Sequence, residues 1–147
     1  MSSLLPYQYI AIEGNIGAGK TSLAKIFSNR FATNLALESF AENTFLPQFY
    51  ENPDRFAFPL EMSFLAERYG QLKQEQEHAF SSGVPLISDY IFEKSMLFAR
   101  VNLTSHELDL FERFFHLIHA GLRRPDLIVF LNKKTSNLKN NIAKRGR

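Results

Sequence analysis

The sequence contains no cysteine among its 147 residues. Disulfides and thiolate metal sites are therefore excluded, and the cytoplasm is the default expectation. No apolar run approaches the roughly 18 residues that a membrane-spanning helix needs. The first ten residues, MSSLLPYQYI, place no basic segment ahead of the apolar ones. We therefore expect neither a membrane span nor a signal peptide.

A strong excess of either charge is also missing, since the formal net charge is +2. So small a charge gives no reason to expect nucleic acid as a partner. Repeats, low-complexity tracts and linkers are not visible either. With 45% hydrophobic and 22% charged residues, the composition is that of an ordinary soluble globule. The length favours one domain with one hydrophobic core over residues 1–147.

Glycine is scarce as well, yet three of the seven glycines fall within the stretch IAIEGNIGAGKTSL. Residues 14–21 fit the pattern G-x-x-x-x-G-K-[ST], between a predicted strand at 7–13 and a predicted helix at 21–31. Glycine lets the backbone curl so that its N–H groups face an anion, and the helix adds its positive end. A glycine-rich turn that only resembles this pattern is the alternative. The predicted nucleotide-binding residues are Gly14, Asn15, Ile16, Gly17, Ala18, Gly19, Lys20, Thr21 and Ser22.

Short apolar segments alternate with helical patterns along the chain. Strands are predicted at 7–13, 35–38, 84–89 and 126–132, and helices at 21–31, 58–81, 92–100, from Thr104 onwards, and 136–144. A short helix is also expected before a break near Pro53. This alternation predicts an α/β fold of the P-loop type, a parallel sheet with helices on both faces in three layers. Ligands of such sheets bind beyond the carboxyl ends of the strands.

Acidic side chains stand at two of these strand ends, Glu38 and Asp89. Lys20 can reach terminal phosphates, and Thr21 can place its hydroxyl on Mg²⁺. Glu38 suits a base for an acceptor hydroxyl, or it is an exposed loop acid. Asp89 suits a metal-associated acid, a helix N-cap, or both. The late cations Lys144, Arg145 and Arg147 either close over donor phosphates or form a solvated helix end.

The later motifs favour a small-molecule kinase over a GTPase. A GTPase needs N-K-x-D after a late strand, but Thr135 stands where the acid belongs, and no D-x-x-G is present. Glu61 and Arg68 share a helix face with apolar residues, so they either bond structural partners or line a polar pocket. His116 and His119 are three residues apart without an acidic or thiol companion, so we expect no metal there.

Taken together, five segments resemble the deoxynucleoside kinases of the deoxycytidine/deoxyguanosine kinase type, particularly their bacterial branch. The segments are IEGNIGAGKTSL, LESFAENTFLPQFYENPDRF, FLAERYGQL, SDYIFEKSMLFAR and RPDLIVFLN…IAKRGR, in the family's order. The resemblance implies transfer of the γ-phosphoryl group of ATP, with Mg²⁺, to the 5′-hydroxyl of a deoxynucleoside. It also implies a homodimer that pairs through helices.

The resemblance assigns roles to individual positions. Glu38 corresponds to the general base near the 5′-hydroxyl, and Tyr50 to a tyrosine at the sugar 3′-hydroxyl. Arg68 corresponds to an arginine near the base pocket, and Asp89 to the acid of an acid-Arg-Ser motif. Arg145 and Arg147 resemble arginines of the lid over the phosphates.

Three positions depart from the family pattern. Glu61 stands where relatives commonly carry glutamine, and an ionised glutamate only accepts hydrogen bonds. It suits the N1–H and N2–H₂ donors of guanine, or the amino group of cytosine or adenine, and we weakly favour deoxyguanosine. Tyr90 replaces an arginine, whose charge Lys94 is expected to supply. The chain stops at Arg147, so the C-terminal strand and part of the lid are expected to be missing. A thymidylate-kinase-like nucleoside monophosphate kinase and a non-catalytic nucleotide-binding module remain alternatives.

Overall fold

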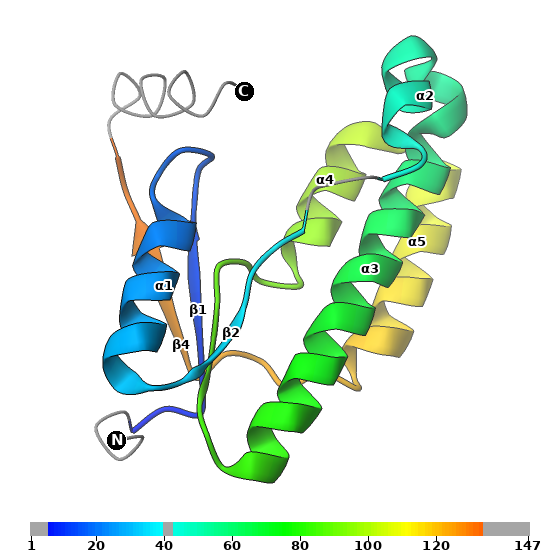
Figure 1. Ribbon diagram of the computed structural model, residues 1–147. Helices are drawn as coiled ribbons and strands as arrows, with labels where there is room; N and C mark the ends of the chain where they lie inside the picture. Colours follow the sequence, from blue (N-terminus) through cyan, green and yellow to red (C-terminus); the bar gives the residue numbers. More distant parts are fainter. Residues whose placement is uncertain (1–5, 40–42, 134–147) are drawn as a thin grey trace. The chain divides into compact units, whose positions relative to one another are not determined.

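The computed structural model describes residues 6–39 and 43–133 (Figure 1). The predicted helix at 136–144 and the predicted site residues Arg145 and Arg147 lie outside these ranges. The chain divides into two compact units. The first unit is assembled from residues 1–38, 75–91 and 124–147, and the second from residues 39–74 and 92–123. Our expectation of a single domain stays a prediction.

A parallel sheet forms the centre of the first unit. Its strands are β1 (Tyr9–Gly14), β2 (Asn34–Ala36), β3 (Leu86–Ser88) and β4 (Leu127–Leu131). They lie in the order β2-β3-β1-β4, and every pair is parallel. Helix α1 (Lys20–Phe31) connects β1 to β2 and lies along the sheet in Figure 1. The predicted α/β class, with a parallel sheet flanked by helices, is confirmed.

The hydrophobic core of the first unit lies between this sheet and α1. Ile10, Ile12 and Ile87 are buried against Ala24 of α1. Because successive strand residues point to opposite faces, Tyr9, Ala11 and Ser88 belong to the other face of the sheet. These three residues are also buried. Both faces of β1 are therefore shielded from water, as its near-continuous apolar sequence predicts.

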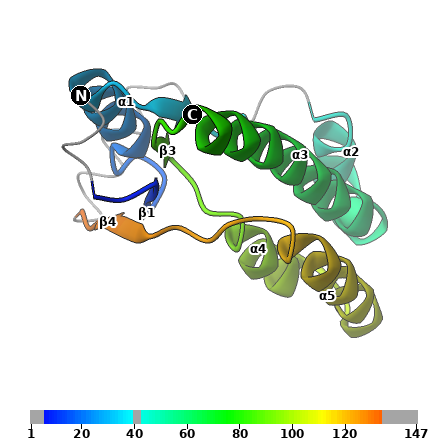
Figure 2. The same ribbon diagram turned by 90° about the horizontal axis from the view of Figure 1, so that it is seen from below.

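The second unit is helical. It contains α2 (Leu46–Glu51), the part of α3 (Pro53–Ser82) up to residue 74, α4 (Lys94–Asn102) and α5 (Ser105–His119). The break expected near Pro53 is confirmed, since α2 ends just before it. Helix α3 begins earlier than the predicted residue 58, at Pro53, which suits a first helical position because no N–H is needed there. Helices α4 and α5 lie beside each other in Figure 2.

The start of α5 follows the sequence closely. The capping box of Thr104 and Glu107 is present, and the Thr104 N–H donates to Oε1 of Glu107 at 3.0 Å. Phe111 and Phe115 of α5 are buried, but Phe114 is 43% exposed. In the described part of the chain, no helix combines the length and the apolarity that a membrane crossing requires.

Candidate active site

The loop between β1 and α1 depends on its glycines. A Cβ atom on Gly14 would lie 2.7 Å from the carbonyl oxygen of Leu131 in β4, so only glycine lets the chain pass this close. Gly19, the N-cap of α1, has φ 98° and ψ 20°, a left-handed conformation that glycine adopts readily. The Ala18 N–H donates to the Asn15 carbonyl at 3.0 Å and tightens the turn. The sequence therefore forms the predicted curled loop.

Lys20, the first residue of α1, folds back over this loop. Its Nζ donates to the carbonyl oxygens of Gly14 at 2.9 Å and Asn15 at 3.1 Å. A positive charge is thus held beside the main chain that the motif predicts to bind phosphate. The carboxylate of Glu13 accepts the N–H of Gly14 at 2.9 Å and fixes the entry to the loop.

Asp89 connects the loop helix to a neighbouring strand end. The hydroxyl of Thr21 donates to Oδ2 of Asp89 at 2.5 Å, and the main-chain N–H of Glu38 donates to Oδ1 at 2.7 Å. The Asp89 N–H donates to the Ala36 carbonyl at 3.2 Å, and Asp89 is only 3% exposed. The first unit thus brings together three of the predicted residues: Thr21, Glu38 and Asp89.

This donor set fits Mg²⁺ that is shared with a nucleotide. Magnesium prefers oxygen ligands, and it usually combines one or two carboxylates with phosphate oxygens and water. Thr21 and Asp89 offer a hydroxyl and a carboxylate oxygen in direct contact. Among the described residues, no group of three or more His, Cys, Asp or Glu side chains could hold a metal ion by itself. The geometry therefore suits a metal ion that takes further ligands from a bound phosphate. Within the described residues it does not suit a metal site made of protein ligands alone.

Glu61 and Arg68 lie in α3, within the second unit, and both are buried, with exposures of 3% and 7%. Asn102 donates from Nδ2 to Oε1 of Glu61 at 3.0 Å. Arg68 donates from Nη1 to the hydroxyl of Ser95 at 3.0 Å. The sequence does not point to Asn102 or Ser95 as partners, because they lie on another helix and no local motif marks them.

The surroundings of both charged side chains are partly aromatic. The Arg68 guanidinium carbon lies 5.2 Å from the ring centroid of Phe64 and 5.8 Å from that of Phe98, within cation–π range. Burial raises the pKa of Glu61, and the hydrogen bond from Asn102 and the charge of Arg68 offset only part of this rise. The result is a buried polar cluster that combines a carboxyl group, a guanidinium group and π faces.

The other predicted substrate residues lie in various surroundings. Tyr50 of α2 is 73% exposed, with its ring 5.9 Å from that of Phe49. Lys94 opens α4, and its Nζ is 5.9 Å from the Phe98 ring centroid. Tyr90, which replaces the expected arginine, is completely buried in the first unit. Glu38 and Asp89 belong to the first unit, whereas Tyr50 and Lys94 belong to the second.

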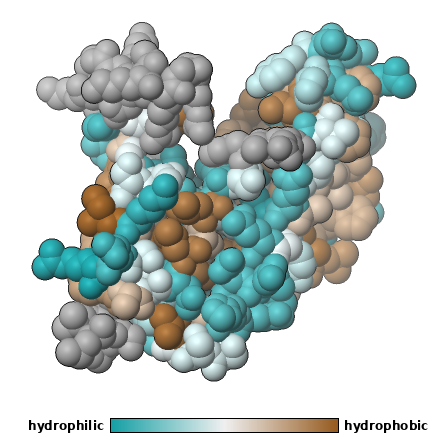
Figure 3. Space-filling view, viewed as in Figure 1, coloured by the Kyte–Doolittle hydropathy of each residue, from teal (hydrophilic) through white to brown (hydrophobic). Residues whose placement is uncertain are grey.

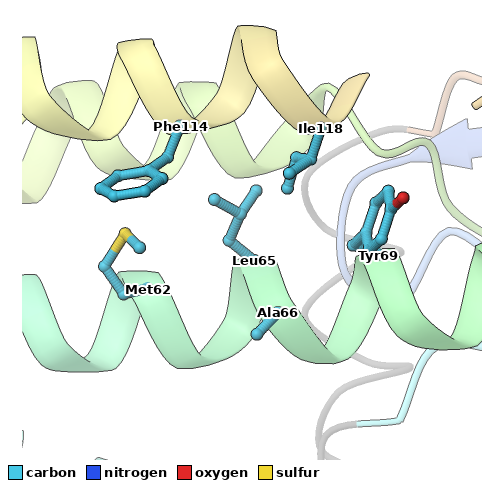
Figure 4. Close-up of a pocket in the computed structure, with 6 residues that line it drawn as sticks. All are labelled: Met62, Leu65, Ala66, Tyr69, Phe114 and Ile118. Atoms are coloured by element: carbon cyan, nitrogen blue, oxygen red, sulfur yellow. The ribbon is translucent and has the colours of Figure 1, made fainter. Parts of the chain in front are cut away.

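The second unit contains an apolar pocket of about 250 Å³. Side chains of α3 and α5 face each other across it in Figure 4. Its lining consists of Met62, Leu65, Ala66, Tyr69, Phe114 and Ile118. None of the predicted site residues within the described ranges lines this pocket.

A parallel sheet whose first strand runs through a G-x-x-x-x-G-K-[ST] loop into a helix defines a P-loop kinase fold, here with a strand-end acid bonded to the loop threonine. The profile of the deoxynucleoside kinase family matches residues 10–147. The chain therefore belongs to the deoxynucleoside kinase family, and its enzyme class is that of a kinase.

Curated relatives agree with this membership. Deoxyguanosine kinase from Bacillus subtilis is 39% identical over 95% of this chain and 67% of its own length. Deoxyguanosine kinase from Lactobacillus johnsonii is 34% identical over 94% and 64%. Deoxyadenosine/deoxycytidine kinase from B. subtilis is 30% identical over 94% and 65%. The chain thus spans about two thirds of the length of these relatives.

Solved structures show the same fold. Deoxyadenosine kinase from M. mycoides, with products dCMP and a flexible dCDP bound, has a TM-score of 0.75 and 25% identity. The same enzyme with dATP bound has a TM-score of 0.74 and 25% identity. The matches cover 95% of this chain and 71% and 72% of those chains, respectively. The fold is thus one that binds nucleotides in its relatives.

Proposed function

We propose that this protein transfers the γ-phosphoryl group of ATP to the 5′-hydroxyl of a deoxynucleoside, with a weak preference for deoxyguanosine. The observation that carries the proposal is the contact of Asp89 with both Thr21 and Glu38. It joins the phosphate loop to an acid suited to an acceptor hydroxyl. Two of the three curated relatives described above are deoxyguanosine kinases, which supports the base preference.

On the phosphate side, the chain works by positioning and by neutralising charge. Main-chain N–H groups of residues 14–22 hold the phosphates of ATP, and Lys20 neutralises the charge near its terminal end. Thr21 and Asp89 would hold Mg²⁺, which supplies further positive charge on the phosphates when bound. By resemblance, Arg145 and Arg147 contribute to the same neutralisation. Glu38 accepts the proton of the attacking hydroxyl.

On the substrate side, we assign nucleoside binding to Tyr50, Glu61, Arg68 and Lys94, together with Glu38 and Asp89. The Glu61 carboxylate can accept hydrogen bonds from a base. A nucleoside monophosphate kinase would instead need cations around the acceptor phosphate, whereas acids stand at positions 38 and 61. We further propose that the two units act as one domain and that the protein works in the cytoplasm.

An ADP-release assay across the four deoxynucleosides and thymidylate tests this function. We expect ATP- and Mg²⁺-dependent ADP release with at least one deoxynucleoside, fastest with deoxyguanosine. Release only with thymidylate would favour the monophosphate kinase. ATP binding without release on any acceptor would favour a non-catalytic nucleotide-binding module.

Replacing Glu61 by Gln should change the base preference. Gln both donates and accepts, so it loses part of the match to guanine's donors and gains one to bases that also accept. We expect the ratio of kcat/KM for deoxyguanosine to that for the other deoxynucleosides to fall by about 10-fold, the effect of one lost hydrogen bond. The exposed Glu67→Gln on the same helix is the control. Unchanged base selectivity in Glu61→Gln would refute the role of Glu61 in recognising the nucleobase.

The same substitution should alter the pH dependence of stability. A carboxyl group whose pKa is higher in the folded than in the unfolded state binds more protons when folded, so the free energy of unfolding falls as pH rises through that interval. Glu61→Gln removes this loss. We expect its melting temperature, relative to wild type, to rise as the pH rises above the ordinary pKa of a glutamate. The matched control is Glu67→Gln, which removes an exposed carboxyl group from the same helix. A melting-temperature difference between Glu61→Gln and wild type that falls as the pH rises would contradict the raised pKa of Glu61.

We also propose a homodimer that pairs through helices. Leu110, Phe114 and Leu117 share one face of α5 and are 43%, 43% and 73% exposed. Figure 3 shows hydrophobic colour over α5 at the edge of the second unit. An apolar surface of this kind is suited to a partner. Sedimentation velocity should show a dimer for wild type and a monomer for Leu117→Glu; a wild-type monomer would exclude the dimer.

A further inference from the structure

Two buried hydroxyl groups lie on the sheet face opposite α1, and the site described above does not include them. The Tyr9 hydroxyl and the Ser88 hydroxyl are 3.1 Å apart, and the two residues are 1% and 0% exposed. Ser88 donates to the carbonyl oxygen of Tyr90 at 2.7 Å. A serine hydroxyl carries one hydrogen, so Tyr9 is the donor to Ser88. The bonds therefore run in one direction, from Tyr9 through Ser88 to the main chain of Tyr90.

We call these two consecutive hydrogen bonds the relay. The relay spans Asp89, the residue on which the proposed phosphate site depends. The bond from the side chain of Ser88 to the carbonyl of Tyr90 spans Asp89 and closes the chain into a tight turn at the end of β3. From within that turn, Asp89 accepts bonds from Thr21 and from the main chain of Glu38. A rotation of the turn would move both carboxylate oxygens away from their donors. The direction of the Asp89 carboxylate is thus tied to the relay.

The relay contributes more to the orientation of the turn at Asp89 than to the free energy of folding. Burying two hydroxyl groups carries a desolvation cost, which their hydrogen bonds roughly offset, so the net gain per bond is small. A hydrogen bond has an angular preference, however, which apolar packing lacks. A phenylalanine and an alanine at these positions would fill the same sheet face without fixing the carbonyl of Tyr90.

We propose that Tyr9 and Ser88 are positioning residues that aim Asp89 at Thr21 and so set how Mg²⁺ bound with a nucleotide is held. The proposal rests on the proposed function, because it concerns the same phosphate site. The Tyr9–Ser88 and Ser88–Tyr90 bonds include neither Thr21 nor the carboxylate itself. Both act through the main chain on either side of Asp89.

Calorimetric titration with ADP, with and without Mg²⁺, tests this role without catalytic turnover. The quantity measured is the ratio of the ADP dissociation constant without Mg²⁺ to that with Mg²⁺. We expect Ser88→Ala to lower this ratio by about 3- to 10-fold, the effect of one lost bond, and Tyr9→Phe to lower it in the same direction. Tyr9→Phe should add nothing in the Ser88→Ala background, because the relay is already broken. Should Ser88→Ala fail to fold, Tyr9→Phe, which keeps the ring, decides the question.

Two matched control variants distinguish an effect on the orientation of Asp89 from a general loss of protein stability. Ser28 also donates to a nearby carbonyl, that of Thr33 at 2.9 Å, but lies at the far end of α1 from Thr21. Ser28→Ala should lower the melting temperature and leave the ratio unchanged, and Tyr7→Phe should change neither. A wild-type ratio in both Ser88→Ala and Tyr9→Phe would overturn the proposal.

The wild-type protein separates this proposal from the proposed function. Mg²⁺-dependent ADP binding without phosphorylation of any deoxynucleoside would refute the function and still allow the relay to be tested. Phosphorylation combined with a wild-type ratio in the variants would refute the relay alone. If ADP binding by the wild-type protein does not depend on Mg²⁺, the relay proposal and the assignment of Thr21 and Asp89 to the Mg²⁺ site are both overturned.

Discussion

Glu38→Gln should still bind deoxynucleoside but turn over about 10²- to 10⁴-fold more slowly, the range for losing a general base. Gln has the same shape but does not accept the proton of the attacking hydroxyl. The main-chain N–H of residue 38 still donates to Asp89, because the substitution leaves the backbone unchanged. The phosphate side should therefore stay intact. Steady-state kcat and calorimetric binding of deoxyguanosine measure the two effects separately.

The control for Glu38→Gln is Glu67→Gln, which removes an exposed acid from the second unit. It should retain wild-type kcat. A Glu38→Gln enzyme with near-normal kcat would show that another group accepts the proton. Loss of deoxyguanosine binding with kcat preserved would make Glu38 a binding residue only.

Asp89→Asn should lower kcat about 10²- to 10³-fold, a typical cost of losing one electrostatic contact at a reacting phosphate or oxyanion. The carboxylate accepts two bonds, one from the Thr21 hydroxyl and one from the Glu38 N–H. An amide has one accepting oxygen, so its NH₂ group must face one of these two donors. Either the end of β2 or the loop helix loses its contact, and the negative charge for Mg²⁺ is lost with it.

The dependence of kcat on Mg²⁺ concentration identifies the cause of the loss. A higher Mg²⁺ requirement is expected for Asp89→Asn, and saturating Mg²⁺ should restore only part of kcat. The matched control is Asp109→Asn, which breaks an exposed pair with Arg113 on α5. It should change neither quantity. A normal Mg²⁺ profile in Asp89→Asn would remove Asp89 from the proposed metal site.

The fold was largely predictable because its signals are local. Apolar strands, the glycine loop and the capping box at Thr104 each occupy a few consecutive residues. Element boundaries were less predictable, since main-chain pairing sets them. β3 covers only Leu86–Ser88 of the predicted 84–89, because these three residues are the ones that pair with β1 and β2.

The phosphate side of the site was predictable for a topological reason. Carboxyl ends of parallel strands meet at one edge of the sheet. That rule alone brings Thr21 and Asp89 together, although they are 68 residues apart. The structure brings Thr21, Asp89 and the main chain of Glu38 together, while the assignment of these residues to a site and their chemical roles stay predictions.

Contacts between helices were not predictable, because no comparable rule fixes which faces meet. Asn102 reaches Glu61 across 41 residues, and Ser95 reaches Arg68 across 27. The expectation that His119 lacks an acidic companion was wrong. Its Nε2 lies 2.7 Å from Oε1 of Glu93, which stands 26 residues earlier on another element. The two side chains are within hydrogen-bond distance and form no metal cluster within the described residues.

The pairing of β1 with β4 has a consequence for the order of folding. Tyr9 and Asp126 are hydrogen bonded although 117 residues separate them, and every segment of the second unit lies between these two points. During synthesis, the ribosome therefore completes the whole helical unit before the last strand of the described sheet emerges. Contacts between distant residues form slowly. We therefore expect the nascent chain to acquire stable helices well before β4 pairs with β1 beside the nucleotide-binding loop.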